Sequence, residues 1–152
     1  MDSYREIQNL LYIYAERIDA GDLKGVAELF ANAEIRALDQ EIGVRGYDEV
    51  LAMYQGSTQI YEKTGTPCTK HVTTNAIIEV DEEDNSAAAR SYFTVFQAVE
   101  GLPLQPIIAG RYHDRFERIN GNWRFRERKM FPELYGDLSR HLLFDAEEIK
   151  KL

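Results

Sequence analysis

The sequence is poor in the features that define several large classes of protein. It has one cysteine, Cys68, which excludes an internal disulfide framework and a zinc site built from several cysteines. No apolar run approaches the ~20 residues that a membrane helix needs, and the chain has no repeat or low-complexity tract. The start, Met-Asp-Ser-Tyr, lacks the apolar segment of a secretion signal. We therefore expect a cytoplasmic protein with no membrane partner.

Positive charge and cofactor motifs are also scarce. The chain has 26 acidic and 18 basic residues, and its net charge of −8 repels a phosphate backbone, so nucleic acid is not an expected partner. It has no glycine-rich phosphate loop, no Gly-x-Ser-x-Gly and no His-Glu-x-x-His. We predict that the protein uses neither a cofactor nor a metal ion.

What remains is an ordinary globular composition, with 44% hydrophobic and 29% charged residues in 152. A chain of this length buries about 68–70% of its unfolded surface and can hold one core. We expect a single domain over residues 1–152, with residues 132–152 as a C-terminal tail.

The first half of the chain has helical periodicity. Apolar residues recur at steps of three and four between Tyr4 and Ile18, which predicts a helix of about seventeen residues. Ser3 and Glu6 have the spacing of a capping box, and Gly21 is placed to end the helix. Asp22 can cap a second helix, and a third is predicted from Tyr47, Val50, Leu51 and Tyr54.

Strand patterns follow. Residues 35–38 and 42–45 suggest a short hairpin, and four segments rich in β-branched and aromatic residues, 71–80, 87–99, 107–119 and 123–130, are separated by turn residues. These predict an antiparallel meander and an α+β domain. A curved sheet around a helix forms a cone whose mouth suits a small molecule.

His71 stands at the start of the first long strand. Alternation places it on one face with Thr73, Asn75 and Ile77, with apolar residues on both faces. A partly buried histidine needs a hydrogen-bond partner, so His71 is either a structural residue or a working base.

The other two histidines are weaker candidates. His113 alternates with charged residues on a face that looks solvated. His141 lies where the periodicity fades, and we expect it to do no more than cover the pocket.

Asp19 lies at the end of the first predicted helix, where the helix dipole disfavours a carboxylate. It is either a turn residue or is offset by a partner. Three arginines, Arg124, Arg126 and Arg128, alternate with Trp123, Phe125 and Glu127 in the last predicted strand. This pattern indicates either one face of aromatic packing and one of basic residues, or an edge strand with solvated arginines.

Several motifs, in this order, resemble the SnoaL-like branch of the nuclear transport factor 2-like superfamily, from about Ile7 to Arg128. They are Tyr-Ala-Glu-Arg-Ile-Asp-Ala-Gly-Asp at 14–22, Lys-His-Val-Thr-Thr-Asn at 70–75, Tyr-His-Asp-Arg-Phe-Glu at 112–117 and Gly-Asn-Trp-Arg-Phe at 121–125. The resemblance implies a cone-shaped α+β barrel around an interior pocket. It also implies a homo-oligomer, a dimer or a trimer, that forms through the outer face of the sheet.

Within that family, the chemical parallels are gamma-hexachlorocyclohexane dehydrochlorinase and scytalone dehydratase, which are cofactor-free lyases with a histidine paired to an aspartate. Asp19 and His71 match that pair, and Arg128 matches an arginine of the dehydrochlorinase. Tyr14 stands where the dehydrochlorinase has a lysine, and Gln97 where the dehydratase has a second histidine. Arg128 has the opposite strand parity to Trp123 and Phe125, so all three face inward only if a β-bulge intervenes.

The resemblance predicts a lyase, isomerase or cyclase that removes a proton from a small apolar, aromatic or polyketide-like molecule. His71 would be the base, Asp19 its orienter and Arg128 the group that stabilises developing negative charge. The hydroxyl groups expected to contact substrate are those of Tyr14, Tyr54, Tyr92 and Tyr112. The alternative is a non-catalytic ligand-binding or assembly module, like the beta subunit of ring-hydroxylating oxygenases.

Overall fold

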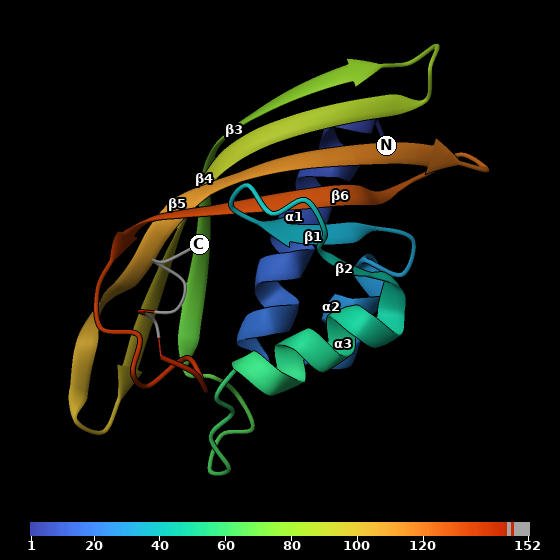
Figure 1. The fold of residues 1–152 in the computed structure, drawn as a ribbon. Helices are drawn as coiled ribbons and strands as arrows, with labels where there is room; N and C mark the ends of the chain where they lie inside the picture. The colour runs from blue at the N-terminus through green and yellow to red at the C-terminus, as the bar shows by residue number, and fades with distance from the viewer. Residues whose placement is uncertain (146, 148–152) are drawn as a thin grey trace.

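Helices lie on one side of a curved six-stranded sheet in the computed structural model, which describes residues 1–145 and 147 (Figure 1). The elements are, in chain order, α1 (Ser3–Asp19), α2 (Leu23–Leu29), β1 (Glu34–Ala37), β2 (Val44–Arg45), α3 (Gly46–Ser57), β3 (Thr69–Asp81), β4 (Ser86–Val99), β5 (Leu102–Ile119) and β6 (Asn122–Tyr135). This is the predicted α+β architecture, with the sheet curled around α1. Among the described residues, no helix has both the length and the apolar character that a membrane span requires.

The strand order is β2-β1-β6-β5-β4-β3. The four long strands pair antiparallel with their neighbours in sequence, as the meander prediction requires. The predicted hairpin of β1 and β2 also forms, and β1 joins the sheet by parallel pairing with β6. That parallel contact, which the sequence pattern did not predict, places the first half of the chain beside the last strand.

Helix α1 buries a stripe formed by Ile7, Leu11, Tyr14 and Ile18, whose spacing follows the helical period. The predicted helix length is confirmed, but Ser3 as the capping residue is wrong. Asp2 is the cap: its backbone is extended and its carboxylate accepts a hydrogen bond from the Arg5 backbone nitrogen at 2.9 Å.

The corner after α1 brings the end of the helix to the start of β3. Gly21 adopts a φ of +75°, and a Cβ there would lie 2.1 Å from the carbonyl oxygen of Gly65. Asp22 then caps α2, as predicted, through the Gly25 backbone nitrogen at 2.8 Å. Only glycine allows the two loops to approach this closely, and their contact holds Asp19 near β3.

A β-bulge interrupts β3 between Thr74 and Ile77, where Asn75 adopts a φ of +40°. The bulge reverses the faces of the strand, so Ile78 points inward whereas Ile77 is 47% exposed. The expectation that Asn75 and Ile77 share the face of His71 is therefore wrong, because alternation by twos fails at a bulge.

A second bulge lies in β6, where Arg126 is the extra residue between the pairs Phe116–Phe125 and Arg115–Glu127. The predicted parity conflict is resolved here. Trp123, Phe125 and Arg128 are all buried on the inner face. In a regular strand the Arg128 side chain would lie on the face opposite to Trp123 and Phe125.

The last strand is longer than predicted. It continues to Tyr135 and accommodates Pro132 at a register shift, so the proposed tail of residues 132–152 begins inside the sheet. The chain then returns toward the helices, where the Leu143 backbone nitrogen donates to the carbonyl of Ser57 at 3.0 Å. The end of the sequence, residues 145–152, is predicted to be either frayed or bound to a partner, and most of it lies outside the described residues.

Candidate functional site

Asp19 and His71, 52 residues apart in the sequence, are hydrogen-bonded where α1 meets the start of β3. His71 Nδ1 lies 2.6 Å from Asp19 Oδ1, and the His71 backbone nitrogen donates to Asp19 Oδ2 at 2.7 Å. The Thr69 hydroxyl donates to Oδ1 at 2.8 Å. These bonds hold the carboxylate from both oxygens, and they offset its unfavourable position at the helix C-terminus.

The environment keeps this carboxylate ionised. Burial opposes the charge, but the hydrogen bonds and charge of His71, together with the Thr69 hydroxyl, outweigh it and lower the pKa of Asp19 below its usual value. An ionised carboxylate accepts only, so the proton of a neutral His71 ring resides on Nδ1. Among the described residues none bonds His71 Nε2, whose lone pair is therefore available to take a proton.

Aromatic rings surround His71 on the inner side. The Tyr14 ring lies edge-on at 6.2 Å between centroids, and the His141 ring lies at the same distance on the C-terminal segment. The His71 and Asp19 side chains are 8% and 10% exposed. The pair is thus enclosed but accessible to a small molecule.

A hollow opens beside the pair, between α1 and the first residues of β3. It has a volume of about 390 Å³ and includes Tyr12, Glu16, Lys70 and Thr73 in its walls, with Asp19 and His71. It gives a route from solvent to the imidazole.

Arg128 lies deeper in the cone and is fully buried. Its Nε and Nη2 atoms donate to the two oxygens of Asp114 at 2.8 and 3.0 Å, and its guanidinium lies over the Tyr112 and Tyr14 rings at 3.7 and 4.4 Å. Burial opposes the charge of Arg128, but Asp114 outweighs burial and raises the pKa of the guanidinium above its usual range. Arg128 therefore stays cationic, with its charge paired.

Asp114 was missed by the sequence reasoning. Strand alternation could have identified it, because Asp114 lies between the inward-facing residues Tyr112 and Phe116 on β5. An acidic side chain on an apolar face needs a cation as its partner. The register pairs Asp114 with Arg128 across β5 and β6.

Three of the four predicted tyrosines meet inside the cone. The Tyr14 and Tyr54 hydroxyl groups are 2.8 Å apart, and Tyr112 packs against Tyr14 at 6.1 Å between ring centroids. Burial raises the pKa of all three, so they remain neutral hydroxyls. The structure does not bring Tyr92 to this cluster: it is 58% exposed on the outer face, because its neighbour Phe93 takes the inward position.

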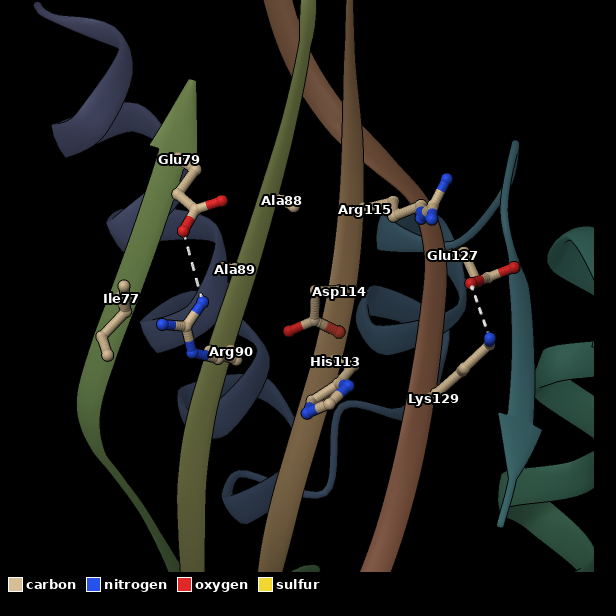
Figure 2. A pocket seen from close by; sticks show the side chains of 10 residues that line it. All are labelled: Ile77, Glu79, Ala88, Ala89, Arg90, His113, Asp114, Arg115, Glu127 and Lys129. Atoms are coloured by element: carbon tan, nitrogen blue, oxygen red, sulfur yellow. Dashed lines mark hydrogen bonds and ion pairs between the residues drawn. The ribbon is translucent and has the colours of Figure 1, made fainter. Parts of the chain in front are cut away.

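His113 is exposed on the outer face of the sheet, as expected. Figure 2 shows it beside a charged hollow across β3 to β6, where Arg90 lies 3.3 Å from Glu79 and Lys129 3.9 Å from Glu127. These oppositely charged side chains pair with each other on the solvent-exposed face of the sheet. The hollow is separate from the Asp19–His71 pair. No group of three or more potential metal ligands occurs within residues 1–145 and 147.

Comparison with known proteins identifies the family. The model of the SnoaL-like domain matches residues 1–129. The chain belongs to the SnoaL-like domain family. A search of curated proteins gave no match.

Solved structures share the fold of this SnoaL-like domain at low identity. An NTF2-like protein with a cystatin-like fold from Novosphingobium aromaticivorans is 21% identical, with a TM-score of 0.70 over 97% of this chain and 86% of that one. A putative scytalone dehydratase from the same organism is 22% identical (TM-score 0.68, covering 88% and 86%). LinA is 22% identical (TM-score 0.68, covering 90% of each chain). At such identities the likeness establishes the fold alone.

Proposed function

We propose that this SnoaL-like domain is a cofactor-independent lyase, isomerase or cyclase in which His71 removes a proton from carbon. The observation that supports it most strongly is the 2.6 Å contact between His71 Nδ1 and an Asp19 carboxylate that is itself held by two further hydrogen bonds. A base needs this arrangement because the carboxylate fixes the tautomer, orients the ring and stabilises the imidazolium.

The proton inventory is simple. His71 Nε2 takes the proton from substrate carbon, the imidazolium forms against Asp19, and the electron pair moves toward a carbonyl oxygen or expels a leaving group. General-base catalysis of this kind contributes about 10²–10⁴-fold. A contribution of this size is useful for removing a proton from a carbon that a neighbouring group already makes acidic.

The interior favours a small, largely apolar, aromatic or polyketide-like substrate. Aromatic rings line this interior: Tyr14 packs edge-on against Tyr112, which stacks on Phe93. Arg128 Nη1 is buried without a hydrogen-bond partner among the described residues, and it is the Arg128 atom suited to stabilise an oxygen that gains charge. Since Asp114 already pairs with the guanidinium, a neutral substrate fits better than a carboxylate. The relatives described as LinA and as a putative scytalone dehydratase agree with small-molecule chemistry in this fold.

The test uses 5-nitrobenzisoxazole, an apolar aromatic probe. A base removes its C3 proton, the electron pair forms the nitrile, the N–O bond breaks and a coloured cyanophenolate is released. We expect His71→Ala to lower kcat/KM by about 10²–10⁴-fold, and Asp19→Asn on the order of tenfold to a hundredfold. His113→Ala removes an imidazole from the outer face and serves as the matched control, with wild-type turnover. Equal rates for wild type, His71→Ala and Asp19→Asn would refute the mechanism.

An assembly role is the second candidate, favoured by apolar side chains on the outer face. Val72, Ile77 and Tyr92 are 39%, 47% and 58% exposed on β3 and β4. Such a patch suits a dimer or trimer of this chain, or a larger partner subunit. Size-exclusion chromatography with light scattering, and mass analysis of complexes isolated from lysate, separate the two. A stable complex with an iron-containing subunit, without turnover of the probe, would favour assembly over catalysis.

A further inference from the structure

The chain after β6 folds back and is fastened beside the Asp19–His71 pair. The side chains of Gln97 and Tyr61 both donate to the carbonyl of Arg140, and the backbone nitrogen of Gln59 donates to the carbonyl of His141 at 2.8 Å. Gln97 is 1% exposed and reaches this carbonyl from the inner face of β4. Three hydrogen bonds, two from the loop between α3 and β3 and one from β4, therefore fix the backbone that carries His141.

His141 lies buried beside the His71 ring, on the segment that follows β6. The residue is 8% exposed. The centroid of its ring lies 6.2 Å from the centroid of the His71 ring, and the two ring planes meet at an angle of 65°. The two rings do not hydrogen-bond to each other. His141 Nδ1 is buried and has no partner among the described residues, and Gln97 Oε1 is in the same condition. Buried polar atoms in native proteins nearly always have a partner.

We propose that His141 is a second substrate-contacting imidazole, which hydrogen-bonds the oxygen of a neutral hydroxyl or carbonyl compound held against His71. This inference rests on the proposed function and names the group that receives the substrate oxygen. Gln97 acts as a positioning residue, because it holds the carbonyl of Arg140 next to His141. The C-terminal segment is thus part of the site and not only its cover.

The charge state of His141 fits this role. Burial and the neighbouring His71 lower the pKa of His141 to about 4, against the opposing effect of Asp19. At neutral pH the ring is uncharged and has one N–H donor and one acceptor nitrogen. It can stabilise an oxygen without placing a second positive charge beside the imidazolium of His71.

The first experiment needs no variant. Long-range ¹H–¹⁵N correlation spectra of the imidazole nitrogens are recorded for the wild-type protein with saturating 2-naphthol, a hydroxyl compound, or 1-tetralone, a carbonyl compound. We expect the nitrogen signals of His141 to shift with at least one of them, and the signals of His113 to stay unchanged. Unshifted His141 signals with both compounds would overturn the proposal.

The second experiment measures turnover of 5-nitrobenzisoxazole, whose oxygen gains negative charge as the N–O bond breaks. We expect His141→Leu to lower kcat by about tenfold to a hundredfold with little change in KM, because a donor acting on the transition state is lost. Leu143→Ala changes an exposed side chain on the same segment and should match wild type. If His71→Ala abolishes turnover while His141→Leu equals Leu143→Ala, the role of His141 fails and the proposed function stands. If His71→Ala retains turnover, the proposed function itself fails.

Discussion

Two buried acid–base pairs of this domain differ in depth and in what they leave free. Asp19 and His71 meet beside a hollow, at 10% and 8% exposure, and one ring nitrogen has no partner among the described residues. Asp114 and Arg128 meet at 0% exposure in a two-point contact under aromatic rings. The first arrangement suits proton exchange. The second holds a permanent charge in place and leaves only Nη1 of its guanidinium without a partner among the described residues.

Breaking the deep pair should have the largest effect. Asp114→Ala leaves the Arg128 charge buried and unpaired, which costs about 3–5 kcal/mol of unfolding free energy. The double variant Asp114→Leu/Arg128→Met removes both charges and should recover much of that loss. Urea unfolding of Asp114→Leu, Arg128→Met and the double variant measures the coupling. Additive losses would show that the two side chains do not act as a pair.

Removing the carboxylate charge of the Asp19–His71 pair should lower the unfolding free energy by a smaller amount, and that amount should depend on pH. Asp19→Asn weakens hydrogen bonds to a charged group, which we expect to lower the unfolding free energy by about 1.5–3 kcal/mol at neutral pH. Since the folded-state pKa of Asp19 lies below its usual value, this stabilisation is present above the ordinary carboxyl range and is lost as the pH falls through the folded pKa. Unfolding curves at neutral and acidic pH should show the gap between wild type and variant narrowing. A gap independent of pH would contradict the ionised carboxylate.

His141 provides a second pH test near the shallow pair. Its folded-state pKa is about 4 and its ordinary value is 6.5, so the unfolded chain takes up the proton first as the pH falls. Stability is therefore full above the ordinary value and declines toward pH 4, with about 1–2 kcal/mol lost by pH 5. The groups that influence His141 are His71 and Asp19. His141→Gln should lose less stability over this range than wild type, and parallel curves would contradict the assignment.

Tyr14 touches both regions, with its ring edge against His71 and its face under the Arg128 guanidinium. Tyr14→Phe keeps these ring contacts and removes only the hydroxyl that bonds Tyr54. We expect a loss of about 1 kcal/mol in unfolding free energy, the smallest of the series. Thermal and urea unfolding check it, with the exposed Tyr92→Phe as the matched control. A loss as large as that of Asp114→Ala would mean that the hydroxyl network, and not the ion pair, dominates the deep region.

Local rules predicted the elements of the fold well because their signals lie within one turn or one strand. The apolar stripe of α1 and the Asp22 cap each depend on neighbouring residues. The failures are at bulges, where one extra residue reverses every later side chain. The bulge at Asn75 moved Ile77 outward, whereas the bulge at Arg126 was anticipated only as a condition for Arg128 to face inward.

The candidate site was predictable only in part, since its members come from distant segments. The resemblance indicated Asp19 and His71 as a pair, and the structure places them in contact. Asp114 escaped notice because its partner lies on the next strand, and His141 was expected only to cover the pocket because the C-terminal segment has no periodic signal. Such contacts depend on how the whole chain packs, which residue spacing does not encode.

The tautomer of His71 tests the central claim most directly. A long-range ¹H–¹⁵N correlation spectrum, recorded well above the ordinary imidazole pKa, distinguishes the two neutral forms of the ring. The account predicts a proton on Nδ1, bound toward Asp19, and a lone pair on Nε2, with this preference weakened in Asp19→Asn. A proton on Nε2 in the wild-type protein would contradict the assignment of His71 as the base.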